Sequence, residues 1–416
     1  MGAPCQPAAG APPAASAANR KAPTDRAATR AKPFEPEKLV RAFRGRREDV
    51  RLKALDEIEH SHLTEPAVPG ALWQAIEPAI RMQHVPDSLL YALKLYGKVD
   101  DRQNDRRFIA LLAAADLRIV MCAVDLIGER RPADSLPALI GLREHREYAT
   151  NYGLRHAVVS AVARFSEPAS VDFLVSTIGA ADGQLKYVAA LQLARLTGEN
   201  FGGKGDSWKE WWQSNREDYR VAAEAAKNPS SAPLPWDYAV PQFYGAPVYA
   251  KRVVFVLDRS KSMLSSVGSV VRLEDACQQL EKAVRALPED SSFEIIAYND
   301  TALPFAGRLV QATPQAKSDA VRFMYSQSPD GKTASFDALA EALRIDSGIE
   351  AILYLSDGDP NTGTIVDRVA IVAAITQQNQ ALRAAIDTIG IDARGASEEF
   401  LKKLASENFG SYRSAR

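Results

Sequence analysis

Three separated stretches of this 416-residue chain carry oxygen-bearing side chains whose types and spacing suit a metal ion. In the first stretch, an apolar run from Val253 to Leu257 is followed by Asp258, Ser260 and Ser262. Such an apolar, β-branched run is typical of a strand buried on both faces in a parallel sheet. One carboxylate and two hydroxyls at the carboxyl end of that strand form an oxygen-only donor set, which favours a hard cation such as Mg²⁺.

The other two stretches add one oxygen-bearing residue each. Thr333 stands in a Gly-Lys-Thr loop before a predicted helix, and Asp357 follows a second apolar run, Ala351 to Leu355, in the sequence Ser-Asp-Gly-Asp-Pro. Taken alone, the first stretch also fits a polar turn in which Asp or Ser caps the next helix. Because ligands bind outside the carboxyl ends of strands in open α/β sheets, the three stretches together favour one shared site.

This order of residues resembles the metal-ion-dependent adhesion site of von Willebrand factor type A domains, and the resemblance covers about residues 249 to 416. The family pattern is Asp-x-Ser-x-Ser, then a Thr in a Gly-rich loop, then an Asp in Ser-Asp-Gly. The matching positions are Asp258, Ser260, Ser262, Thr333 and Asp357. The resemblance implies that these residues hold Mg²⁺, Mn²⁺ or Ca²⁺, directly or through water. It also implies that the ion accepts an Asp or Glu side chain of a partner protein, without catalysis.

Two lysines depart from the family pattern. Lys261 stands between the two serines, where the family usually has Gly, and Lys332 follows Gly331, where a second Gly is usual. These lysines either point outward and steer an acidic partner toward the site, or occupy the site and weaken metal binding. Lysine side chains usually extend into solvent, which favours the first alternative.

Alternating apolar and helical segments predict the elements that position these residues. We expect residues 249–416 to form a doubly wound, Rossmann-like α/β domain with a mainly parallel six-stranded sheet. The third predicted strand is an edge strand or hairpin arm. The predicted strands are 253–257, 292–298, 302–310, 351–355, 385–391 and 410–414, and the predicted helices are 276–287, 315–327, 335–343, 366–382 and 398–406.

Residues 35–220 are predicted to be all-helical and repetitive. Five segments place an alanine among apolar residues at helical spacing, at intervals of 38, 31, 38 and 29 residues; the alanines are Ala54, Ala92, Ala123, Ala161 and Ala190. These intervals are typical of two-helix solenoid repeats, and the stretch resembles degenerate HEAT repeats. An unrelated helical bundle is the alternative. Near the end of this region, Trp208, Trp211 and Trp212 either form a cap that seals the solenoid or provide a binding platform.

The remaining segments are predicted to be less regular. Residues 1–34 are rich in Ala and Pro, with five basic residues against one acid, and are expected to form a disordered arm. Residues 221–248 carry five prolines alternating with aromatics, which predicts a stiff, extended linker that packs along the neighbouring domains. Residues 1–34 lack the apolar core of a signal peptide, so we expect a cytoplasmic protein by default. An extracytoplasmic location stays open if the start is truncated.

Composition excludes several classes of function. The formal net charge of −1 predicts binding to neither nucleic acid nor an anionic membrane, and no apolar run is long enough to cross a bilayer. Three dispersed cysteines predict neither a disulfide framework nor a Cys-based metal site. All five histidines precede residue 258, which argues against a zinc site at residues 258–357.

Three functions remain as hypotheses. The first is a non-catalytic protein-interaction module that binds an acidic residue through a divalent cation, with the helical repeats as a second binding surface. The second is a solenoid scaffold with a weak or vestigial metal site. The third is an NTPase, because Asp330 to Thr333 resembles the end of a phosphate loop. That loop would need a Gly where Ser326 stands and a preceding strand where a helix is predicted, so the sequence argues against it.

Overall fold

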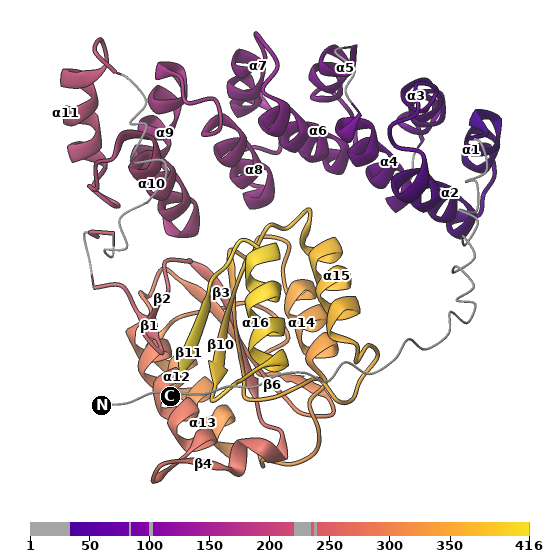
Figure 1. Cartoon of the computed structure of the whole chain (residues 1–416). Helices are drawn as coiled ribbons and strands as arrows, with labels where there is room; N and C mark the ends of the chain where they lie inside the picture. Colours follow the sequence, from indigo (N-terminus) through magenta and orange to yellow (C-terminus); the bar gives the residue numbers. More distant parts are fainter. Residues whose placement is uncertain (1–33, 83–84, 100–102, 220–233, 237–238, 416) are drawn as a thin grey trace, which may run out of the picture.

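The computed structural model describes residues 34–82, 85–99, 103–219, 234–236 and 239–415 (Figure 1). All but the last residue of the arm predicted for residues 1–34, and most of the first half of the linker, therefore lie outside the described residues. Residues 36–215 are helical, as predicted, and we call them the helical array. Its helices are α1 (Pro36–Arg44), α2 (Glu48–Ser61), α3 (Val68–Ala79), α4 (Asp87–Lys98), α5 (Gln103–Leu111), α6 (Leu117–Arg130), α7 (Leu136–Gly141), α8 (Tyr152–Val162), α9 (Pro168–Ala180), α10 (Gly183–Thr197) and α11 (Gly205–Asn215), with a short 3₁₀ helix at Leu142–Glu144.

The array is a curved double layer of helices. The even-numbered helices α2 to α10 form the inner, concave layer, and the odd-numbered helices α1 to α9 lie outside them (Figure 1). Each helix packs mainly against helices one or two positions away in sequence, and one elongated apolar core runs through the layers. The five alanines that the sequence singled out fall one on each inner helix: Ala54, Ala92, Ala123, Ala161 and Ala190.

The tryptophan-bearing helix α11 lies at the end of the array and packs against α9. Trp208 and Trp212 are buried, and their indole N–H groups donate to the Gly202 carbonyl and to Asp172 at 2.8 and 2.7 Å. The preceding helix α10 ends at Gly198, which adopts a left-handed conformation (φ +79°). Two of the three tryptophans are thus part of the array's core.

The second half of the linker differs from the predicted extended connector. Gln242–Phe243 (β1) and Ala246–Pro247 (β2) form an antiparallel hairpin. The chain reverses there because Tyr244 and Gly245 both have positive φ, as a tight hairpin turn requires. The aromatics pack, as predicted: Phe243 is buried in the core of the following domain, against Phe255.

The C-terminal α/β domain contains one seven-stranded sheet in the order β11-β10-β9-β3-β6-β7, with β8 also paired to β6. The five strands β11, β10, β9, β3 and β6 are parallel, and β7 and β8 run antiparallel to β6. The strands of this sheet are β3 (Arg252–Asp258), β6 (Ser292–Tyr298), β7 (Ala302–Pro304), β8 (Val310–Gln311), β9 (Ala351–Ser356), β10 (Ala385–Ile391) and β11 (Tyr412–Ala415). A short hairpin of β4 (Ser266–Val267) and β5 (Val270–Val271) stands apart from it.

The prediction of six strands is wrong because the predicted strand 302–310 is interrupted. The buried carboxylate of Glu294 on β6 accepts the backbone N–H groups of Ala306 and Arg308 at 3.0 to 3.1 Å, and also that of Ile295 at 2.8 Å. These bonds replace part of the strand ladder, and Gly307 turns the chain with φ +68°. The segment therefore yields two short edge strands, β7 and β8, in place of one.

Helices cover both faces of the sheet. One apolar core joins the sheet to α12 (Arg272–Ala286) and α13 (Pro314–Ser326), and a second joins the other face to α14 (Ser335–Arg344), α15 (Arg368–Asn379) and α16 (Ala396–Glu407). The helices match the predicted ranges to within two residues, except that α12 begins earlier, at Arg272, and α15 ends earlier, at Asn379. This arrangement leaves the carboxyl ends of β3, β9 and β10 on one edge, which we call the carboxyl edge.

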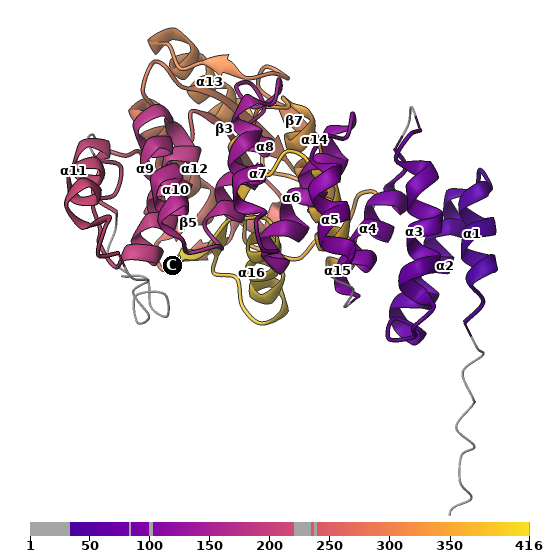
Figure 2. The ribbon, with the colours of Figure 1, turned by 90° about the horizontal axis from the view of Figure 1, so that it is seen from above.

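The helical array docks against the opposite, amino edge of the sheet (Figures 1 and 2). Glu350, just before β9, accepts the backbone N–H groups of Gln184 in α10 and Lys251 before β3, both at 3.0 Å. Tyr187 of the array stacks on Tyr249 with ring centroids 4.2 Å apart. The two domains therefore share a polar and aromatic interface.

A second group of contacts lies where α8 meets the end of α15. His156 packs edge-on against Phe409 at 4.9 Å, and the Arg383 guanidinium pairs with Asp125 of α6. Gly153 approaches the Ala381 carbonyl so closely that a Cβ there would lie 2.1 Å from the oxygen. Beside these contacts, a cleft of about 1320 Å³ opens between the inner layer and α15. None of the helices within the described residues has the length and apolarity that crossing a membrane would require.

Candidate metal site

The carboxyl edge of the sheet receives the predicted residues from three loops. Asp258 is the last residue of β3, and Ser260 and Ser262 follow it, the latter in a short 3₁₀ helix (Lys261–Leu264). Asp357 directly follows β9. Because β3 and β9 are adjacent and parallel, their ends meet at the same point of the edge. The sequence therefore correctly predicted which strands deliver the two aspartates.

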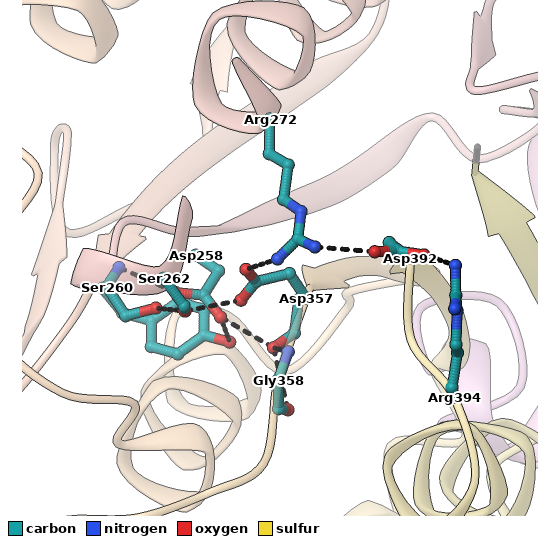
Figure 3. Close-up of polar contacts among 10 residues, drawn as sticks. Asp258, Ser260, Ser262, Arg272, Asp357, Gly358, Asp392 and Arg394 are labelled. Carbon is teal, nitrogen blue, oxygen red and sulfur yellow. Dashed lines mark hydrogen bonds and ion pairs between the residues drawn. The ribbon is translucent and has the colours of Figure 1, made fainter. Parts of the chain in front are cut away.

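A chain of hydrogen bonds connects four of the five predicted residues (Figure 3). The Ser260 backbone N–H donates to Asp258 Oδ1 at 2.8 Å, and the Ser260 and Ser262 hydroxyl oxygens lie 2.9 Å apart. The Ser262 hydroxyl donates to Asp357 Oδ1 at 2.8 Å. Ser260 and both aspartates are buried, whereas Ser262 is exposed, so the oxygen cluster opens to solvent at Ser262.

The fifth predicted residue, Thr333, lies on a neighbouring loop. No hydrogen bond in the described part of the chain joins its side chain to the other four. Backbone contacts hold the loops together instead: Lys261 N–H donates to the Gly331 carbonyl at 3.2 Å, and Thr333 N–H donates to Asn361 Oδ1 at 2.9 Å. Thr333 is 2% exposed. It thus lies between the loop after β3 and the loop after β9, facing the interior.

The Asp258 carboxylate is buried and surrounded by neutral donors. Its Oδ2 accepts the Ser356 hydroxyl at 2.7 Å and the Tyr298 hydroxyl at 3.2 Å. With the Tyr298 hydrogen on Asp258, the Tyr298 oxygen accepts from the Tyr354 hydroxyl at 2.6 Å, and Tyr354 accepts from the Ser335 hydroxyl at 2.7 Å. Burial, with a smaller contribution from the nearby Asp357 charge, raises the pKa of Asp258 to about 6. A buried carboxylate with neutral partners alone is a site that a cation would stabilise.

The two lysines that depart from the family pattern do not enter this cluster. The side chains of Lys261 and Lys332 are both exposed. A different cation reaches it: Arg272, the first residue of α12, donates to Asp357 Oδ2 at 2.7 Å and to Asp392 at 2.7 Å (Figure 3). Asp392 follows β10 and also pairs with the exposed Arg394. Sequence reasoning missed Arg272 and Asp392 because neither stands in the motif.

Two observations indicate that these oxygen donors suit a hard divalent cation. With metal–oxygen bonds of 2.0–2.1 Å, adjacent ligands of an octahedral Mg²⁺ lie about 2.8–3.0 Å apart. The Ser260–Ser262 and Ser262–Asp357 oxygen pairs already have separations of 2.9 and 2.8 Å. In addition, three carboxylates in this network (Asp258, Asp357 and Asp392) face only two guanidinium groups.

Hydroxyl groups are indispensable to such a site. Among the residues that the structure describes, no three His, Cys, Asp or Glu side chains gather where they could hold a metal ion. Asp258 and Asp357 alone would supply two charges, and the serine and threonine oxygens would have to complete the protein's share of the coordination. The loop around Lys332 follows helix α13, not a strand, which does not fit a phosphate loop.

Comparison with known proteins gives the C-terminal domain a family. Residues 251–414 match the model of the von Willebrand factor type A domain. The chain is 24% identical over 171 residues to inter-alpha-trypsin inhibitor heavy chain H2 of Homo sapiens, covering 38% of this chain and 17% of that protein. It is 29% identical over 130 residues to heavy chain H3 of Mesocricetus auratus, covering 29% and 14%. The chain thus spans less than a fifth of the length of these relatives.

Among solved structures, the protein is similar to a von Willebrand factor type A protein from Catenulispora acidiphila. The two are 24% identical with a TM-score of 0.35, over 41% of this chain and 40% of that chain. The match to the family model identifies residues 251–414 as a von Willebrand factor type A domain and does not extend to the helical array.

Proposed function

We propose that the von Willebrand factor type A domain of this chain is a non-catalytic protein-interaction module that binds a partner's Asp or Glu through a divalent cation. Domains of this family are in general protein-interaction modules. Asp258, Ser260, Ser262, Thr333 and Asp357 would hold Mg²⁺, or Mn²⁺ or Ca²⁺ in its place. When bound, the ion would supply a Lewis-acidic position that a carboxylate can occupy.

One observation carries the proposal. A buried carboxylate with only neutral hydrogen-bond donors, Asp258, lies next to a chain of oxygens that opens to solvent at Ser262. In an apolar interior an ionised carboxylate is costly unless a positive charge compensates it. A divalent cation would supply that charge, and the exposed Lys261 and Lys332 would attract an acidic partner toward the opening.

We further propose that the helical array is a HEAT-type scaffold and provides a second binding surface. The two-layer arrangement with one repeated alanine per inner helix supports this assignment. Part of the inner layer already holds the α/β domain, so the surfaces left for a second partner are the outer layer and the cleft beside α15. The array lies at the amino edge, so a partner confined to the carboxyl edge would not contact it.

The alternative, a scaffold whose metal site is vestigial, has one observation in its favour. Arg272 already donates to Asp357, and a cation on that carboxylate reduces the need for a metal. The two alternatives differ in a direct measurement, because only the first requires the purified chain to bind a divalent cation.

The test is calorimetric titration of Mg²⁺ and Mn²⁺ into the full-length chain after treatment with EDTA. We expect saturable binding to one site, which Asp258→Asn abolishes while circular dichroism stays unchanged. Asp346→Asn is the matched control, because it removes the same charge at the amino edge of the same sheet, where Asp346 pairs with Arg252. Loss of binding in both variants, or no binding by the unmodified chain, would rule out the site.

Partner binding is tested with the same variants. A partner captured by the unmodified chain in Mg²⁺ should be released by EDTA and should not bind the Asp258→Asn protein. Capture that persists in EDTA would leave the fold assignment intact but remove the metal from the mechanism.

A further inference from the structure

Arg272 occupies the position at the carboxyl edge where a positive charge is most needed. Its side chain is 15% exposed, and its guanidinium bridges Asp357, whose side chain is fully buried, and Asp392, which is 26% exposed. The two contacts are both 2.7 Å long, the usual length of a charge-assisted hydrogen bond. Arg272 thus links the carboxylates that end two adjacent strands, β9 and β10.

The position of Arg272 on its own helix is unfavourable. It is the first residue of α12, where the partial positive charge of the helix dipole repels cations and favours acids. Its Nε–H group is buried and has no hydrogen-bond partner among the described residues. Helix formation therefore does not explain an arginine there. The two carboxylates do, because they compensate the guanidinium charge.

We propose that Arg272 is a resident counter-ion that competes with the divalent cation for Asp357 and so sets the metal affinity of the site. This inference rests on the proposed metal site. In the absence of metal, Arg272 keeps the buried Asp357 carboxylate compensated. When a cation takes that carboxylate, the contact between Arg272 and Asp357 must weaken, and its free energy is subtracted from the free energy of metal binding.

Asp392 has a different part in the same competition. It is a second carboxylate for the Arg272 guanidinium, and it lies outside the oxygen cluster, at the end of the neighbouring strand. Arg272 therefore keeps an ion-pair partner when Asp357 binds the metal. Removing Asp392 should therefore weaken metal binding, whereas removing Arg272 should strengthen it. A purely structural salt bridge predicts no such opposite pair of effects.

The test measures Mg²⁺ and Mn²⁺ affinity of the full-length chain by calorimetry, together with thermal stability in EDTA. A charge-assisted hydrogen bond is worth about 1.5–3 kcal/mol, so Arg272→Gln should lower the Kd for Mg²⁺ by about 10- to 150-fold. It should also lower the Tm in EDTA, because Asp357 then lacks a counter-ion, and Mg²⁺ should restore the Tm. Asp392→Asn should raise the Kd.

Arg394→Gln is the matched control. It removes the same charge next to the same Asp392, but Arg394 is 85% exposed and its contact is to Asp392. Competition predicts a Kd close to that of the unmodified chain, whereas a general effect of net charge would lower the Kd in both arginine variants and overturn the proposal. An unchanged Kd in Arg272→Gln, with the unmodified chain binding Mg²⁺, would also overturn it and leave the metal site standing. Absence of Mg²⁺ binding in every variant would instead remove the metal site itself.

Discussion

Acidification should weaken the docking of the two domains through one buried histidine. His156 of α8 is 5% exposed and packs against Phe409 of the α/β domain and against Tyr152 of its own helix. Its Nδ1 has no hydrogen-bond partner among the described residues. Burial, together with the positive charge of Arg383, lowers the pKa of His156 to about 3. The imidazole is therefore neutral in the docked protein and has no group that would stabilise a proton.

The size of the effect follows from the difference between the two pKa values. In the folded protein the pKa of His156 is about 3, below the ordinary value of 6.5. Above pH 6.5 the imidazole is therefore neutral in both the folded and the unfolded state, and its burial has no pH-dependent effect on stability. As the pH falls below 6.5, His156 becomes protonated in the unfolded state but stays neutral in the folded state. Each pH unit between 6.5 and 3 then costs about 1.4 kcal/mol of stability, which is about 2 kcal/mol at pH 5.

The assay compares the unmodified chain with His156→Phe in urea denaturation at pH 7 and pH 5. Four of the five tryptophans lie in the helical array and the fifth, Trp236, in the linker, so tryptophan fluorescence mainly follows the array, and circular dichroism follows the whole chain. Burial raises the pKa values of Glu350 and Asp387, so their protonation stabilises the folded protein as the pH falls. This contribution is the same in both proteins. The difference between the proteins therefore isolates His156.

Between pH 7 and pH 5, we expect the free energy of unfolding of His156→Phe to fall by about 2 kcal/mol less than that of the unmodified chain. Phe keeps an aromatic ring against Phe409 and gives up no hydrogen bond at Nδ1, so the pH 7 stability should change little. Equal losses in the two proteins would show that His156 accepts a proton in the docked state, and the reasoning from its burial would be refuted.

Three further substitutions test the interface and the edge of the sheet. Gly153→Ala should weaken docking by about 1–3 kcal/mol, because its Cβ would clash with the Ala381 carbonyl, while Gly179→Ala, which meets open space, should leave the urea midpoint unchanged or raise it. Asp125→Asn should cost about 1–3 kcal/mol in urea denaturation by leaving the Arg383 guanidinium, 6% exposed, without its anion. Glu294→Ala leaves three backbone N–H groups without an acceptor; hydrogen exchange of residues 302–311 should accelerate, and unchanged exchange would contradict the role of that carboxylate.

Local patterns were enough to predict the elements that carry the candidate site. The short apolar runs before Asp258 and Asp357 are typical of buried strands, and parallel strands place their carboxyl ends on one edge whatever the connections between them. The five repeated alanines likewise mark the inner helices, because a residue that recurs once per helix pair occupies the same layer each time.

Contacts between distant segments could not be predicted in the same way. Arg272 looks like any basic residue near a helix start, and its role depends on Asp357 and Asp392, which lie 85 and 120 residues away. The break in the predicted strand 302–310 depends on Glu294, whose side chain would ordinarily be assigned to a solvated edge. The docking of the array depends on Glu350, which accepts a backbone N–H from Gln184 across 166 residues.

The positions of the array and the candidate site on the sheet have a functional consequence. Strand β9 begins next to Glu350, which contacts the array, and ends next to Asp357, so the two lie at opposite ends of a six-residue strand. Seven residue steps of about 3.3 Å place them about 23 Å apart, which is more than twice the Debye length of about 8 Å in physiological salt. Loss of docking in the Gly153→Ala protein at pH 7, where Asp258 with its pKa of about 6 stays ionised, should therefore leave metal binding by the carboxyl edge intact. A partner that contacts both regions would have to span the length of the sheet, and its affinity, unlike that of the metal, would depend on docking.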